Sequence, residues 1–106
     1  MKIRIIYNFK LLPQNYTAMT IYPFILTGHS FLNSAILKHE MIHVEQVERD
    51  GWFRFYLTYL FDFAMNLIRY KNWSDAYFNI PYEVEAYDRE HEDLTEKELG
   101  KINGRH

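Results

Sequence analysis

Hydrophobic and polar positions alternate along the first part of the chain, as is typical of β-strands. Residues 3–7 (IRIIY) have apolar or aromatic side chains at every second position and predict a short first strand. Residues 17–26 (TAMTIYPFIL) are β-branched and aromatic and predict a second strand, in which Pro23 requires an edge position or a strand end. Residues 13–15 (PQN) mark the turn between these strands.

A helical period replaces this alternation after residue 33. Apolar residues recur at helical spacing between residues 36 and 47, which predicts an amphipathic helix. Asn33 or Ser34 can cap the start of this helix, and Gly51 is a natural terminator.

Two further helices are expected downstream. Residues 52–71 predict one long aromatic helix, and the polar sequence KNWSD that follows predicts a loop. Asn79 and Pro81 then mark the start of a helix that should reach about Glu92.

The last residues, 93–106, carry their own helix signal. Thr95 and Glu98 have the spacing of a capping box, and Leu94 and Leu99 have the spacing of a hydrophobic staple. We therefore expect a short, ordered helix in this tail.

These elements predict one α+β domain over residues 1–106. A length of 106 residues fits a single domain, and no repeat or interdomain linker divides it. We expect a small β-sheet packed on the helix of residues 36–47, with the long aromatic helix and the helix after Pro81 completing the core.

Composition and charge narrow the function classes. Hydrophobic residues make up 48% of the chain, so it should fold. The net charge of -2 with scattered basic residues does not favour nucleic acid as a partner. The absence of cysteine excludes disulfides and thiolate metal ligands. The first ten residues lack the pattern of a signal peptide. Together with the absence of cysteine, this favours a cytoplasmic, soluble protein.

The aromatic segment 52–70 has nearly the length that spans a bilayer. Two arginines, an aspartate and an asparagine interrupt it, at Arg54, Asp62, Asn66 and Arg69, and charges inside a spanning helix are costly. We therefore expect a helix buried on most sides in a soluble protein. A helix lying on a membrane surface is the alternative that is not favoured.

The sequence HEMIH at residues 39–43 is the strongest chemical signal. On a helix, His39 and His43 lie on one face and can direct ring nitrogens at one metal ion. Glu40 projects about 100° around the helix from His39, so it can reach a water on that metal without binding the metal itself. This is the helical zinc motif of metalloproteases. Roughly 2% of sequences with this composition contain the pattern by chance, so an ordinary solvated helix face is the competing interpretation.

A catalytic zinc site needs a third protein ligand. Three more histidines are present, but a lone histidine in a loop, such as His29, is more often solvated. The stronger candidates are two glutamates on the predicted downstream helix, Glu83 and Glu85. The further histidines are His29, His91 and His106.

The order His39-Glu40-x-x-His43, followed downstream by Glu83-Val84-Glu85-Ala86, resembles the gluzincin clan of zinc metallopeptidases. It is most similar to the minigluzincin family, which are soluble single-domain peptidases of about this length. They are similar to the catalytic domains of membrane-embedded peptidases of the CAAX-prenyl-protease and heat-shock types. The resemblance implies a zincin-like fold and a peptidase held latent by its C-terminal segment.

The resemblance also implies which glutamate binds zinc. Relatives use the first glutamate of an E-x-x-A-[D/N] stretch, which makes Glu83 the ligand. Glu85 lies about 160° away on the helix and should form a salt bridge elsewhere. Tyr87 stands where relatives carry Asp or Asn, so either its hydroxyl or a backbone carbonyl is expected to accept a hydrogen bond from a zinc-binding histidine.

The sequence therefore predicts a zinc-dependent metallopeptidase. His39, His43 and Glu83 would bind Zn²⁺, and Glu40 would activate a water on the metal to hydrolyse a peptide or protein substrate. The strand at 18–26 would pair with the substrate, and the oxyanion donor stays open among Tyr82, Tyr87, Arg89 and His91.

Two further hypotheses concern activity and its control. A catalytically silent zinc-binding or structural module that acts through a protein partner is the alternative to an enzyme. The tail, residues 93–106, is expected to lie in or over the cleft and inhibit a latent zymogen, either within its own chain or by self-association with a neighbour. Its donors are Glu96, Glu98, Asn103, His106 and the terminal carboxylate.

Overall fold

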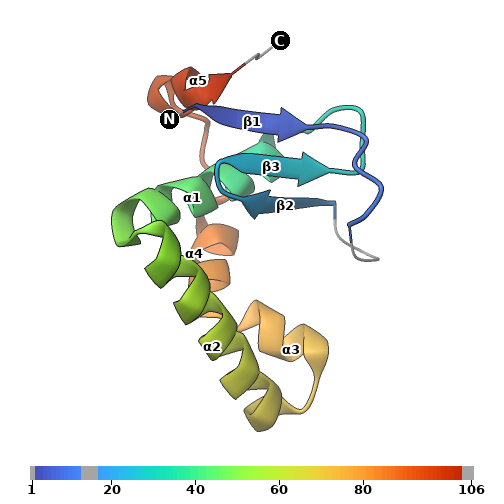
Figure 1. The fold of residues 1–106 in the computed structure, drawn as a ribbon, viewed down its shortest axis with the longest axis vertical. Helices are drawn as coiled ribbons and strands as arrows, with labels where there is room; N and C mark the ends of the chain where they lie inside the picture. The colour runs from blue at the N-terminus through green and yellow to red at the C-terminus, as the bar shows by residue number, and fades with distance from the viewer. Residues whose placement is uncertain (1, 13–16, 104–106) are drawn as a thin grey trace.

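The structure is a computed structural model that describes residues 2–12 and 17–103. The turn predicted at residues 13–15 and the tail donor His106 lie outside these residues. The fold is α+β, as predicted, with a small sheet at one end and helices beneath and beyond it (Figure 1).

Four short strands form one sheet in the order β2-β3-β1-β4. Strands β2 and β3 pair antiparallel, whereas β1 is parallel to both β3 and β4. The strands are β1 (Ile3–Ile6), β2 (Ala18–Ile21), β3 (Phe24–Thr27) and β4 (Ile102–Asn103).

The prediction of one strand over residues 17–26 was wrong, because this segment is a hairpin. The chain reverses between β2 and β3 at Tyr22 and Pro23, which are joined by a cis peptide bond. Pro23 has no N–H group to continue a ladder, so the strand ends there. Consequently β2, not a longer strand, forms the edge of the sheet on the side of the helices, where the Tyr56 hydroxyl donates to the Thr20 carbonyl.

Helix α1 (Ser34–Asp50) forms the floor on which the sheet packs. The Asn33 side chain accepts a hydrogen bond from the Ile36 N–H, which confirms one of the two predicted caps. At the other end, Gly51 has a φ of 91° and donates its N–H to the Val47 carbonyl, so the helix stops where the sequence predicts. Buried apolar side chains of the sheet and of α1 form the core: Ile3, Ile25, Met41, Val44 and Ile102.

The downstream helices differ from the expectation in their number, in the end of α4 and in the burial of α2. The sequence expected as a polar loop begins a helix, α3 (Trp73–Phe78), because the Asn72 side chain caps it by accepting from the Asp75 N–H. Helix α4 (Pro81–Arg89) begins with Pro81 at its first turn, as predicted, but it ends at Arg89 and not near Glu92.

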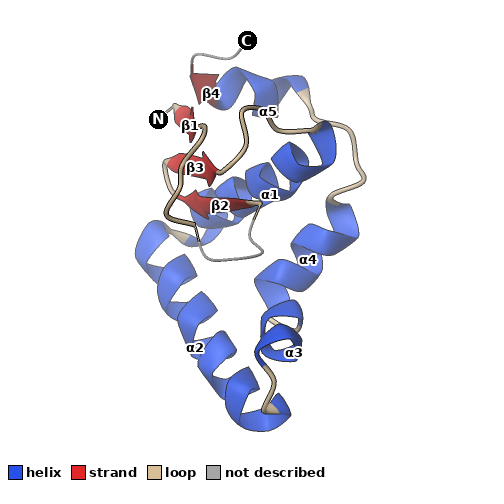
Figure 2. Cartoon of the chain, turned by 90° about the vertical axis from the view of Figure 1, so that its right-hand side faces the viewer, coloured by secondary structure: helices blue, strands red, loops and turns tan. Residues whose placement is uncertain are grey.

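Helix α2 (Trp52–Tyr70) is a single helix, as predicted, but it is not buried on most sides. It diverges from α1 after Gly51 and, together with α3, forms an arm that projects away from the sheet (Figures 1 and 2). Only Phe55 of α2 is buried, because α3 and part of α1 cover one side of the helix and no described residue covers the other. No helix among the described residues is long and apolar enough to cross a membrane.

The described part of the tail does not lie over a cleft of its own chain, in contrast to the prediction. Helix α5 (Glu96–Lys101) has the predicted Thr95–Glu98 capping box, and β4 then pairs with β1 at the sheet edge opposite β2. The buried Lys38 ammonium of α1 donates to both carboxylate oxygens of Glu98, at 2.8 and 3.0 Å. The tail up to residue 103 is therefore part of the folded sheet.

The exposure of α2 predicts unequal effects of two phenylalanine truncations. Phe55→Ala should lower the free energy of unfolding by about 3–5 kcal/mol, since it empties a buried site. Phe61→Ala, at a side chain that is 63% exposed on the same helix, should change it by less than about 0.5 kcal/mol. Urea unfolding measures both values, and equal losses would mean that the outer side of α2 is covered in solution.

The Lys38–Glu98 pair predicts that the tail stabilises the fold. Glu98→Gln preserves the oxygen that caps α5 but leaves the buried Lys38 charge with only the more distant Glu92 carboxylate, 3.8 Å away, which should cost about 2 kcal/mol. Glu96→Gln, at an exposed position of the same helix, is the matched control and should be nearly neutral. Thermal unfolding compares them, and an equally small effect of both changes would contradict a stabilising role of the pair.

Candidate metal centre

Three residues of α1 bring the chemical groups of the HEMIH sequence to one place. His39, Glu40 and His43 are all buried, at 7%, 6% and 5% exposure. The i and i+4 spacing puts the two imidazole rings on one face of the helix, with ring centroids 4.9 Å apart. Burial of two histidines and a glutamate next to each other contradicts the interpretation of a solvated helix face.

Helix α4 supplies a carboxylate that faces both rings. Glu83 lies in the first turn of α4, where its N–H donates to the carbonyl of the buried residue Ile80. Its Oε1 atom is 3.1 Å from His39 Nε2 and 3.2 Å from His43 Nε2. One ligand atom from each of the three side chains lies within 4.8 Å of the others.

The second ring nitrogen of each histidine has its own acceptor. His43 Nδ1 is 2.8 Å from Gln46 Oε1, and His39 Nδ1 is 2.8 Å from a carboxylate oxygen of Glu90. The Gln46 amide nitrogen donates to the Tyr82 carbonyl and to Glu85, so the amide oxygen is left to accept. Both imidazoles are thereby held with N–H at Nδ1 and with Nε2 directed at Glu83.

Tyr87 does not have the role that the sequence predicted for it. Neither its hydroxyl nor a backbone carbonyl accepts from a candidate ligand histidine, since Glu90 and Gln46 do so. The Tyr87 ring instead packs edge-on against His39, at 4.4 Å between centroids, and its hydroxyl lies 3.3 Å from that of Tyr77.

The donor set fits a zinc ion. In neutral imidazoles with Nδ1 protonated, two Nε2 lone pairs and one carboxylate oxygen point at the same place, and only a cation or protons there can make this arrangement stable. Tetrahedral bonds of about 2.0 Å imply ligand separations of about 3.3 Å, close to the two distances from Glu83 Oε1. The Tyr59 hydroxyl donates to Glu83 Oε2, which leaves Oε1 as the oxygen available to a metal.

In the absence of a metal, protons occupy this place. Burial opposes protonation of His43, but the hydrogen bond and charge of Glu83 outweigh it and raise the His43 pKa to about 9. The same balance raises the pKa of His39. Burial acts against ionisation of Glu83, yet the hydrogen bonds from His39 and His43 hold the Glu83 pKa far below its usual range.

Glu40 lies beside the cluster at the wall of a pocket. The Thr20 hydroxyl of β2 donates to Glu40 Oε1 at 2.6 Å, which orients the carboxylate, while burial raises the Glu40 pKa. A pocket of about 300 Å³ is lined by Glu40, His43 and Glu83 on one side. Its other walls are mostly apolar and aromatic side chains of β2 and α2, including Met19, Ile21, Phe55, Tyr56 and Leu60.

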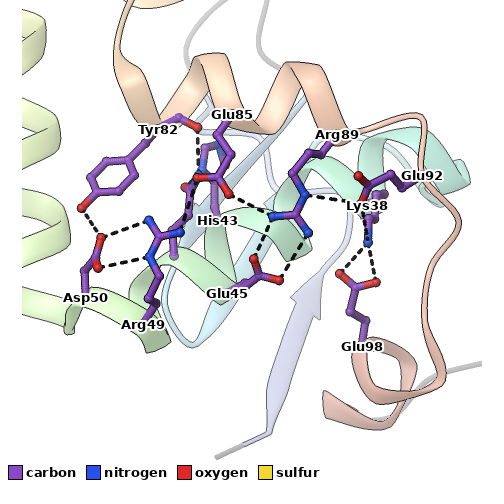
Figure 3. Close-up of polar contacts among 11 residues, drawn as sticks. Lys38, His43, Glu45, Arg49, Asp50, Tyr82, Glu85, Arg89, Glu92 and Glu98 are labelled. Carbon is purple, nitrogen blue, oxygen red and sulfur yellow. Dashed lines mark hydrogen bonds and ion pairs between the residues drawn. The ribbon is translucent and has the colours of Figure 1, made fainter.

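Glu85 lies away from the cluster and in a salt bridge, as predicted. Its carboxylate accepts from Arg89 at 2.9 Å and from Gln46 at 3.0 Å. Arg89 also donates to Glu45 of α1, and the Tyr82 hydroxyl donates to Asp50 at the end of α1 (Figure 3). This network fastens α4 to α1 on the side facing away from the pocket.

The remaining sequence candidates are not in the site. His29 and His91 are exposed, and Arg89 and Tyr82 serve the network between α1 and α4. None of the four suggested oxyanion donors is among the described residues that line the pocket, whereas Tyr59 and Tyr77 are.

Sequence reasoning missed four residues around the site. Two had a signal in their spacing, since Gln46 follows His43 by three positions and Glu90 follows Glu83 by seven, which places each pair on one helix face. The other two, Thr20 and Tyr59, reach the site only through tertiary contacts.

Comparison with known proteins gives no relative from which to assign a family. No family model, no curated protein and no solved structure matches this chain.

The raised His43 pKa predicts how the metal-free protein responds to pH. The pKa is about 9 in the folded chain and about 6.5 in an unfolded chain, so protonation of His43 stabilises the fold fully below about pH 6.5. This stabilisation should disappear as the pH rises through about 9, with a loss on the order of 3 kcal/mol. Urea unfolding with a chelator measures it. His91→Gln should retain this pH dependence and His43→Gln should lose most of it, so equal slopes would contradict the assignment.

Proposed function

We propose that this protein is a zinc-dependent metallopeptidase of the gluzincin type. The observation that carries the proposal is the convergence of His39, His43 and Glu83 beside an apolar pocket, whose wall includes His43, Glu83 and the Glu40 carboxylate. The proposal agrees with the resemblance to minigluzincins and includes their zincin-like fold.

The three converging side chains would hold the metal. When bound, zinc would act as a Lewis acid that polarises a carbonyl and makes a water more acidic. The Nδ1–H bonds to Gln46 and Glu90 fix the ring orientations and increase the donor strength of both Nε2 atoms. The Tyr59 hydrogen bond keeps Glu83 directed at the same point through one oxygen.

Glu40 would move the proton. Its carboxylate lines the pocket and does not contact Glu83 as the two histidines do, so it is available to take a proton from the attacking water and give it to the leaving amine. Burial raises its pKa, which makes the carboxylate a better base than an exposed glutamate. The Thr20 hydroxyl holds one oxygen and limits its rotation.

The peptide would bind between β2 and the arm. β2 is the edge strand next to Glu40. The Tyr56 hydroxyl contacts the Thr20 carbonyl and the Tyr22 N–H at this edge, so an extended chain would pair with β2 by replacing that hydroxyl. Burial, with the nearby charge of Glu83, raises the Tyr77 pKa far above its usual value. The Tyr77 hydroxyl therefore keeps its proton, and it lines the pocket as a candidate donor to a developing oxyanion.

Substitutions of three glutamates test the proposal. The full chain should contain about one zinc per chain by mass-spectrometric metal analysis. Glu40→Gln should keep the zinc and reduce hydrolysis of a broad peptide library by at least about 100-fold, since it removes the base alone. Glu83→Gln should lose the zinc, whereas Glu85→Gln, two residues away on the same helix, should keep both zinc and activity.

Two results would contradict this function. Zinc lost from Glu85→Gln but kept by Glu83→Gln would place the metal elsewhere. Zinc bound by the parent chain with no hydrolysis, and with no difference between parent and Glu40→Gln, would identify the silent zinc-binding module instead.

A further inference from the structure

The side of α2 that faces away from α3 is a continuous apolar stripe. Its residues follow one another at spacings of three and four along the helix, so all of them lie on one side. Each is between 46% and 69% exposed, and no described residue covers them. We call this stripe the outer face of α2; it consists of Phe53, Leu57, Phe61, Met65 and Ile68.

The opposite side of α2 carries the partners expected of a packed helix. Phe55 is buried there, Asn66 donates to the Ala76 carbonyl of α3, and the Phe63 ring packs on Trp73 at 4.9 Å. The polar Asn66 therefore faces protein, whereas large apolar side chains face outward. The arm is thus held in place by its inner side, and the outer face is left for an external partner.

Charges near this face are cationic. Arg54, Arg69 and the capping residue Lys71 are exposed, and none forms an ion pair with another described residue. Asp62 is the one acidic residue of α2 and is half-buried. An apolar stripe with unpaired cations near both ends matches an anionic partner.

A second copy of the chain fits this face poorly. If two α2 helices paired by a two-fold axis in antiparallel orientation, Arg54 of one copy would lie near Arg69 of the other. In parallel orientation each arginine would meet its own equivalent. Neither arrangement supplies an acidic group, and like charges held together destabilise a contact. Lipid phosphates, in contrast, would neutralise all three cations.

We propose that the outer face of α2 binds the surface of an anionic lipid bilayer, with the helix lying in the plane of the headgroups. A helix with one apolar side and flanking Lys or Arg residues binds in this way. The binding does not depend on a metal, so it stands apart from the proposed peptidase activity.

A tryptophan reporter is placed in the outer face by Ile68→Trp, at a side chain that is 69% exposed, because Trp73 packs on Phe63 and Trp52 packs on Tyr56, away from this face. The full chain is mixed with vesicles of phosphatidylglycerol and phosphatidylcholine, or of phosphatidylcholine alone. With the anionic vesicles we expect co-sedimentation, a blue shift of the tryptophan emission and quenching by brominated acyl chains. Binding should weaken as the salt concentration rises.

Two sets of variants separate the apolar and charged contributions. Leu57→Gln with Phe61→Gln should abolish the blue shift without unfolding the protein, since both side chains are exposed. Replacing Arg54, Arg69 and Lys71 with Gln should lower partitioning into anionic vesicles by about five-fold per charge, or about 100-fold in all. Phe31→Gln changes a 71% exposed aromatic residue outside the arm and is the matched control that should bind normally.

Three results would overturn the proposal. Neither sedimentation nor a blue shift with anionic vesicles would show that this face does not bind lipid. Sedimentation without a blue shift or quenching would show that the arm does not insert. A dimer in analytical ultracentrifugation that Phe61→Gln dissociates, with no vesicle binding, would assign the face to a second copy of the chain.

Discussion

The buried Gln46 amide connects the two helices on which the candidate site depends. Its oxygen accepts from His43 of α1, and its nitrogen donates to the Tyr82 carbonyl and the Glu85 carboxylate of α4. Because an amide has one acceptor side and one donor side, these contacts can be satisfied together in one orientation only. The same group therefore sets the tautomer of His43 and the position of α4, and with it the position of Glu83.

The buried polar groups around Gln46 also have hydrogen-bonding partners. Burying His39, His43, Glu40 and Glu83 together is costly unless every charge has a partner, and no described buried side-chain atom lacks one. Salt bridges hold the side of α4 that faces away from the pocket, where Arg89 joins Glu85 to Glu45. The site is thus preorganised from two directions: hydrogen bonds behind the rings, and ion pairs behind the helix that carries the carboxylate.

Local signals predicted those parts of the fold that depend on local sequence. The cap at Asn33, the stop at Gly51 and the Thr95–Glu98 capping box each involve residues a few positions apart. The paired histidines belong to the same class, because the helix repeat alone places them together. The bond between Thr20 and Glu40 was not predictable in this way, since it spans 20 positions and exists only because β2 lies beside α1.

For a similar reason, composition predicted that α2 is buried on most sides, whereas only Phe55 is buried. A run of aromatic residues is equally compatible with a core and with an exposed face, and the difference depends on whether another element arrives to cover it. The position of the tail was also not predictable from its composition. Its donors suggested that it lies in the cleft, but Glu98 instead pairs with Lys38, and β4 pairs with the edge of β1.

The pairing of β1 with β4 has a consequence for the order in which the molecule assembles. Ile3 pairs with Ile102, so the last strand can join only after a loop of nearly the whole chain has closed. The β2–β3 hairpin and α1 need only short-range contacts and can form earlier, whereas long-range pairings of this kind slow folding. The two edges of the small sheet therefore form at different times. The β2 edge beside the pocket belongs to the part of the structure that local contacts form early, whereas the β4 edge forms only when the last strand pairs with β1.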